Sequence, residues 1–231
     1  MALALAVDGE LGIDAGVRVH APDGALVWSA IHELGSLRDS VGGIAADPSG
    51  DVYVSGSANV AVDGIAVVLR VSGSDGSELW RFEQDGPVAG TTDYAYALDL
   101  DDQGRVLAAI AAGDEQGQTD VELHALDPET GSSAWVGTWA SPNAVDDRPF
   151  AMTYDAARGR VWVYVYSQAD LRPPPPTLLA FEPPLTEPVL VAHPLEFTAP
   201  ESALPRASCS TSRARSGWRS KSWTRRRSRG P

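Results

Sequence analysis

The stretch ALDPETGSSAW, residues 125–135, combines an aspartate, a Thr-Gly turn and a tryptophan four residues after the glycine. Weaker copies of this motif occur as APDGALVW at 21–28 and as SGSDGSELW at 72–80. The three tryptophans, Trp28, Trp80 and Trp135, are 52 and 55 residues apart. Self-similarity at such a period is the signature of a repeat architecture, so we expect a chain built from tandem units.

A second motif repeats independently with nearly the same period. Its first copy contains GIAADPSGDVYVSG at 43–56, and each copy is preceded by an aspartate in steps of 54 residues, at Asp39, Asp93 and Asp147. A further aspartate and a turn glycine follow in each copy, at Asp47, Asp101 and Asp155 and at Gly50, Gly104 and Gly159. The spacings of the two motifs, which we call the two repeat registers, therefore agree on a repeat unit of about 54 residues.

Within one unit, apolar residues alternate with their neighbours on both sides of an Asp-Pro-Ser-Gly turn, which is typical of a half-buried β-hairpin. The stretch IAVVLRVSGSDGSELWRFE, residues 65–83, predicts a second hairpin around Asp75 and Gly76. Four short antiparallel strands without a helical period predict a β-propeller blade. The expected fold class is all-β, a partial β-propeller of about three and a half four-stranded blades.

The registers also predict the boundaries of the units. We expect a partial blade at 1–34, blades at 35–92 and 93–146, an incomplete blade with a Pro-rich segment at 147–200, and a basic tail at 206–231. Known propellers close with roughly four to eight blades, so the chain is expected to be a fragment or a shortened product. An open array exposes unpaired strands and apolar faces, which predicts head-to-tail self-association or aggregation.

These motifs resemble known repeat families. ALDPETGSSAW resembles the A-x-D-x-x-T-G-x-x-x-W signature of bacterial PQQ-like, quinoprotein-type propeller blades, and residues 27–57 are similar to the SBBP β-propeller repeat. The resemblance covers roughly residues 1–185 and implies a propeller fold and a periplasmic, cell-surface or secreted protein. The start, MALALAVDGE, lacks the features of a signal peptide. Both repeat types occur in proteins of many roles, so the resemblance alone assigns no activity.

Each repeated residue has an expected structural role. The tryptophans would bury apolar area between neighbouring blades, and Gly131 would form the turn that aims Trp135. The aspartates Asp39, Asp93 and Asp147 would accept backbone N–H groups in the loops before the innermost strands. A ligand site would instead need residues that break the repeat.

A search for catalytic and metal-binding motifs finds none. The sequence has no H-E-x-x-H, no G-x-S-x-G and only one cysteine, Cys209. His20 and His124 are expected at the surface. The carboxylates of DLDDQG, residues 99–104, and of the Asp146-Asp147 pair lack the spacing of a calcium loop and are expected to be solvated turn groups.

Charge is distributed very unevenly along the chain. Residues 206–231 contain nine of the 18 Lys and Arg residues and no acid, which leaves nine basic and 31 acidic residues and a net charge of −22 at 1–205. Residues 1–205 are therefore not expected to bind nucleic acid, because nucleic acids bind proteins largely through basic residues. The tail is either an Arg/Ser-rich nucleic-acid or nuclear-targeting segment or the product of out-of-frame translation, and is expected to be disordered.

Two functions follow as alternatives. The first is a non-enzymatic binding or scaffold module of an exported or envelope-associated bacterial protein, with a protein or glycan partner, no cofactor and no membrane span. The second is a fragment of a PQQ-dependent quinoprotein dehydrogenase, in which resemblance implies pyrroloquinoline quinone and calcium. None of the cofactor-specific Arg, Asn and Glu positions of such enzymes can be placed here, which favours the first.

Overall fold

The computed structural model describes residues 2–8, 13–35, 38–60, 63–142, 146–168, 176–184 and 186–192. All of them belong to one compact unit, Met1–Leu195. The second unit, Glu196–Pro231, which contains the predicted basic tail, lies outside the described residues, as does most of the run of four prolines at 173–176. The described part of the chain forms fifteen strands and contains no helix.

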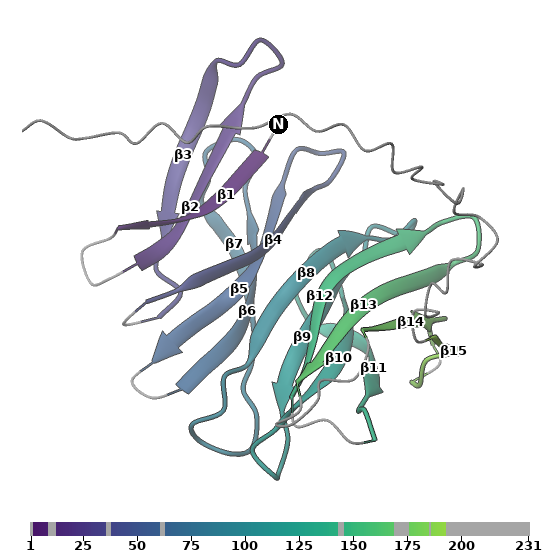
Figure 1. Ribbon diagram of the computed structural model, residues 1–231. Helices are drawn as coiled ribbons and strands as arrows, with labels where there is room; N and C mark the ends of the chain where they lie inside the picture. The colour runs from purple at the N-terminus through teal and green to yellow at the C-terminus, as the bar shows by residue number, and fades with distance from the viewer. Residues whose placement is uncertain are drawn as a thin grey trace, which may run out of the picture. The chain divides into compact units, whose positions relative to one another are not determined.

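The strands follow one another in four antiparallel groups (Figure 1). Group 1 contains β1 (Ala2–Asp8), β2 (Ile13–His20) and β3 (Leu26–His32). Group 2 contains β4 (Ser40–Ala46), β5 (Val52–Val60), β6 (Asp63–Val71) and β7 (Glu78–Gln84). Group 3 contains β8 (Tyr94–Leu100), β9 (Val106–Gly113), β10 (Thr119–Leu126) and β11 (Ser133–Trp139). Group 4 contains β12 (Asp146–Asp155), β13 (Arg160–Gln168), β14 (Thr177–Phe181) and β15 (Leu190–Ala192).

The predicted all-β, antiparallel, propeller-type architecture is confirmed. The number of about three and a half blades stays a prediction, because one parallel pair, Thr119 with Asp146, joins groups 3 and 4 into a single 8-stranded sheet. The Pro-rich stretch after Phe181 differs from a plain extended segment, since it contributes the three-residue strand β15, which pairs with β14.

Neighbouring groups pack against each other through apolar side chains. In β6, Val67 and Leu69 join a buried cluster with Ala15 and Val17 of group 1, whereas Val68 joins a cluster with residues of group 3. Successive side chains of a strand point to opposite faces, so one strand serves two interfaces. This explains why β6 is almost continuously apolar. A third cluster joins groups 3 and 4 in the same way.

A repeated contact, which we call the indole joint, explains why both the glycine and the tryptophan of the motif recur. The ring N–H of Trp28 on β3 donates to the carbonyl of Gly73 at 2.8 Å, in the last turn of the next group. A Cβ added to Gly76 in that turn would lie 2.8 Å from the Trp28 ring. Gly76 also has a φ of +80°, which only glycine adopts at low cost.

The second joint repeats this geometry between groups 2 and 3. The ring N–H of Trp80 donates to the carbonyl of Pro128 at 2.7 Å. Gly131, with a φ of +71°, lies against the same ring, since an added Cβ would be 2.7 Å away from it. The glycine of ALDPETGSSAW is therefore required both by the turn and by the tryptophan of the preceding group.

The third tryptophan has no complete joint. Trp135 is buried against Phe181, with ring centroids 6.3 Å apart, but its ring N–H has no hydrogen-bond partner among the described residues. The turn after β14 has the sequence EPPLTEPV at 182–189 and contains no glycine on which an indole could lie. The repeat therefore departs from its pattern in group 4.

Candidate functional site

The repeated aspartates Asp39, Asp93 and Asp147 lie at or just before the first strands of groups 2, 3 and 4, and the first two tie loops together. The carboxylate of Asp39 accepts the amides of Leu34 at 2.9 Å and Asn59 at 3.3 Å. The carboxylate of Asp93 accepts the amides of Gly86 at 3.1 Å and Gly113 at 2.5 Å. In both cases one carboxylate links the loop before the first strand to the second strand of the group.

The third aspartate of this set differs from the other two. One oxygen of Asp147 accepts the amide of Ser141 at 2.7 Å, but the other is buried without a hydrogen-bond partner in the described part of the chain. Within the same described residues, the hydroxyls of Ser141 and Ser167 are also buried without partners. Asp147 is 2% exposed, so the expectation of a solvated turn carboxylate is wrong here.

The other repeated aspartates close turns at the opposite end of the strands. Asp47 and Asp101 each accept two backbone amides of their own turn, and Asp155 pairs with Arg158 at 2.7 Å. Each turn ends in a glycine with positive φ, namely Gly50 (100°), Gly104 (77°) and Gly159 (61°). Asp101 is only 8% exposed, which also corrects the expectation of a solvated group.

A pocket of about 390 Å³ lies at the end where β8 and β12 begin. Its walls come from the loop 90–92, Tyr96 of β8, Thr119 of β10, and Asp146 and Arg148 of β12. These segments meet because β8 and β12 are the first strands of adjacent groups and β10 pairs with β12. We call this end of the strands the pocket end.

Four aromatic side chains form a row that includes the wall of the pocket. Tyr94 and Tyr96 on β8, Phe150 on β12 and Tyr166 on β13 follow one another with ring centroids 4.3, 5.2 and 6.2 Å apart. Phe150 is 50% exposed, an unusual degree for a phenylalanine. Burial raises the pKa of both Tyr94 and Tyr96 above that of an ordinary tyrosine. The aromatic row joins two groups and is open to solvent at Phe150.

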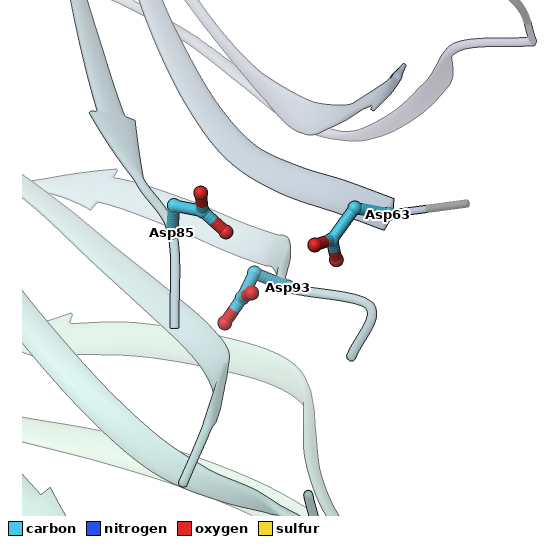
Figure 2. A group of neighbouring side chains, drawn as sticks. All are labelled: Asp63, Asp85 and Asp93. Carbon is cyan, nitrogen blue, oxygen red and sulfur yellow. The ribbon is translucent and has the colours of Figure 1, made fainter. Parts of the chain in front are cut away.

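Three carboxylates converge near the pocket (Figure 2). Asp63 at the start of β6, Asp85 after β7 and Asp93 before β8 place oxygen atoms within 4.8 Å of one another. Burial raises the pKa of Asp93, and the charges of Asp85 and Asp63 raise it further, against the opposing effect of its two amide bonds. Carboxylate oxygens are the ligands that hard cations prefer, so this cluster could hold a divalent ion.

The negative charge extends to β10. Burial, reinforced first by the nearby charge of Asp114, raises the pKa of Asp120 to about 6. Among the described residues that line the pocket, Arg148 is the only cation, and its side chain lies 3.7 Å from Asp146. The pocket end is therefore suited to neutral or cationic ligands and unsuited to anions.

Sequence reasoning missed this assembly. Asp63 and Asp85 stand outside both repeat registers, and they meet Asp93 only because β6, β7 and β8 begin or end at the same place. The predicted surface position of His124 is also wrong, because this side chain is only 4% exposed. It forms hydrogen bonds with Glu122 and Ser133 and packs on Phe82. Its ring fills the interface between groups 2 and 3.

No protein-family model and no curated protein sequence matches the chain. Among solved structures, the chain is similar to the quinohemoprotein alcohol dehydrogenase from Comamonas testosteroni, with a TM-score of 0.51 and 14% identity, over 81% of this chain and 35% of the dehydrogenase. The chain thus spans about a third of that protein's length. It is also similar to an endo-arabinase from Bacteroides thetaiotaomicron VPI-5482, with a TM-score of 0.39 and 12% identity, over 78% of this chain and 71% of the arabinase.

At these identities the likeness concerns the fold alone. The described part of the chain contains no helix that is long and apolar enough to span a membrane. The strand groups, their packing and the likeness to the dehydrogenase together identify a β-propeller-type fold.

Proposed function

We propose that this chain is a non-enzymatic, propeller-type binding module of an exported or envelope-associated bacterial protein, and that it binds neutral glycans at the pocket end. The observation that carries the proposal is the aromatic row beside the pocket. The cellular location rests only on the resemblance of the repeats.

The chemistry of a sugar chain fits this surface. A pyranose ring has C–H groups on its faces, which pack on aromatic rings, and hydroxyl groups around its edge, which need polar partners. Phe150 and Tyr96 offer the ring faces, while Thr91, Thr119 and Arg148 offer donors and acceptors in the pocket. The described wall of the pocket is mostly polar, so the apolar contacts of a bound sugar would come from Tyr96 and from Phe150 beside the pocket.

Charge narrows the ligand class further. Asp63, Asp85, Asp93 and Asp120 lie at or next to the pocket end, and the pocket wall adds Asp146. Uronic acids, phosphates and sulfated sugars would therefore be repelled. Neutral glycans are the favoured class.

The pocket wall supports binding rather than catalysis. Its carboxylate, Asp146, accepts the Thr119 hydroxyl at 3.4 Å and lies 3.7 Å from the Arg148 guanidinium. Among the described residues that line the pocket there is no cysteine, serine or histidine, which are common nucleophiles and general bases.

The quinoprotein alternative does not fit these residues. Pyrroloquinoline quinone carries three carboxylates, whereas the pocket wall offers Arg148 as its single cation and lies in an acidic surrounding. We therefore propose no quinone site here. A rise in melting temperature on adding the quinone and calcium to the purified protein would contradict this conclusion.

The proposal is tested by titrating the protein with cellohexaose, maltohexaose and xylohexaose in solution. We expect at least one hexasaccharide to bind, and Phe150→Ala to weaken that binding about tenfold, which corresponds to about 1.4 kcal/mol. Tyr164→Ala is the matched control, because Tyr164 is a comparably exposed aromatic residue, at 43%, outside the aromatic row. Equal losses in both variants, or no binding by any of the three sugars, would contradict the proposal.

A further inference from the structure

The loop aspartates of groups 2 and 3 form closed contacts, which we call aspartate clamps. The carboxylate of Asp39 accepts the amide of Gly35 from the preceding loop at 3.2 Å and that of Asn59 from the second strand at 3.3 Å. A Cβ added to Gly35 would lie 2.7 Å from the carbonyl oxygen of Asn59, so the loop and the strand are in direct contact. The clamp of Asp93 is closed in the same way, since a Cβ added to its loop glycine, Gly86, would lie 2.8 Å from a backbone oxygen of the second strand. Neither clamp has room for a side chain at the loop position.

The third clamp, around Asp147, is built differently. Its loop residue is Ser141, whose amide donates to one carboxylate oxygen at 2.7 Å, and its second strand places Ser167 opposite Asp147. Directly paired residues of antiparallel strands point to the same face, with Cβ atoms about 5 Å apart. The other oxygen of Asp147 and the hydroxyls of both serines are buried and have no hydrogen-bond partner among the described residues. Three buried, unsatisfied oxygen atoms therefore lie together at one carboxylate.

This arrangement favours a cation as the ligand. A buried carboxylate oxygen without a partner is costly, and a positive charge beside it offsets that cost. The next residue, Arg148, pairs with Asp146 instead, at 3.7 Å. The serine hydroxyls add neutral oxygen ligands, so the donor set consists of oxygen atoms only. Hard cations prefer such donors, whereas soft metals prefer sulfur.

Burial selects among the hard cations. Ser167 and Asp147 are 1% and 2% exposed, so an ion held between them must give up part of its hydration shell. Magnesium loses water reluctantly, whereas calcium accepts protein oxygen ligands in flexible geometry. We infer that Asp147, Ser141 and Ser167 form a calcium site, in which the aspartate supplies the charge and the serines supply two neutral oxygen ligands. With a single carboxylate ligand the site is weak, with an expected Kd of about 1 mM.

This site is separate from the pocket and from the carboxylate cluster of Figure 2. Asp146 lines the pocket, and successive side chains of a strand point to opposite faces, so Asp147 points away from the pocket. The cluster of Asp63, Asp85 and Asp93 belongs to groups 2 and 3. Calcium binding at Asp147 and glycan binding at the pocket are therefore independent of each other.

The test compares melting temperatures of the EDTA-treated full chain in calcium at about 10 mM, roughly ten times the expected Kd, and in sodium chloride of equal ionic strength. Calcium should raise the melting temperature of wild type, and magnesium should raise it less. Asp147→Asn and the double variant Ser141→Ala/Ser167→Ala should each bind calcium at least tenfold more weakly and lose the rise. Without calcium, Ser167→Ala should be at least as stable as wild type, because it removes a buried hydroxyl that has no described partner.

Two control variants assign the effect to this site. Ser57→Ala also removes a hydroxyl that is buried without a described partner, from a serine that is 1% exposed in group 2, and should keep the rise. Asp85→Asn removes a charge from the carboxylate cluster and should keep the rise as well. Because calcium alone raises the melting temperature, only a further rise on adding the quinone would indicate a quinone site.

Four results would overturn the inference. They are the absence of a rise in wild type, a rise with magnesium as large as that with calcium, an undiminished rise in either the folded Asp147→Asn or the double serine variant, and the loss of the rise in Asp85→Asn. The last result would place the ion at the carboxylate cluster.

Discussion

The indole joint between groups 2 and 3 predicts a specific coupling between Trp80 and Gly131. Replacing Trp80 with alanine removes the ring and its N–H bond to Pro128, but Arg70 still donates to that carbonyl at 2.5 Å. Trp80 is also only partly buried. We therefore expect a loss of about 3 kcal/mol in the free energy of unfolding, at the low end for a truncated tryptophan.

Replacing Gly131 with alanine has two separable costs. The φ of +71° costs a residue with a Cβ about 1 kcal/mol. The new methyl group would also lie 2.7 Å from the Trp80 ring, and such overpacking costs about 1–3 kcal/mol more. Gly104→Ala is the control for the first cost alone, because Gly104 has a φ of +77° and open surroundings.

Urea unfolding of the single and double variants measures the coupling. In a Trp80→Ala background the clash disappears, so Gly131→Ala should cost only about 1 kcal/mol, as Gly104→Ala does in the wild type. Strictly additive losses for Trp80→Ala and Gly131→Ala, or equal losses for Gly131→Ala and Gly104→Ala in the wild type, would refute the joint.

Two further predictions concern charge and the third tryptophan. The pKa of Asp120 is raised to about 6, so the folded state binds its proton more tightly than the unfolded chain, and this group's contribution to stability falls as the pH rises from about 4 to about 6. Asp120→Asn should therefore stabilise the protein more at pH 8 than at pH 4 in urea unfolding, and an equal effect at both would contradict the burial of this carboxyl. Trp28→Phe should cost about 1 kcal/mol for its lost hydrogen bond beyond the change in ring size. Trp135→Phe should cost less, because it removes an N–H that has no partner among the described residues, and equal losses would speak against the broken third joint.

The sequence predicts the architecture because the residues that build it recur. A glycine four residues before each joint tryptophan and an aspartate before each first strand are visible as spacings. Their physical reasons are local: a positive φ at Gly76 and Gly131, and loop amides that need a carboxylate acceptor at Asp39 and Asp93.

The candidate site could not be predicted in the same way. Its residues are those in which the groups differ: Tyr96 and Phe150 come from different groups, and Asp63 and Asp85 belong to no repeat register. Spacing along the chain does not reveal which strand ends meet. The burial of His124 was missed for a related reason, since only the structure shows Phe82 packed on its ring.

The central claim, that the pocket end is the binding surface, is tested most directly by mapping amide chemical shifts while a bound hexasaccharide is titrated into isotopically labelled protein. The account predicts the largest shifts at Thr91, Thr92 and Gly117, beside the aromatic row, and none at the turn glycines Gly50, Gly104 and Gly159 at the opposite end of the strands. Shifts concentrated at those turns, with the pocket unchanged, would contradict it.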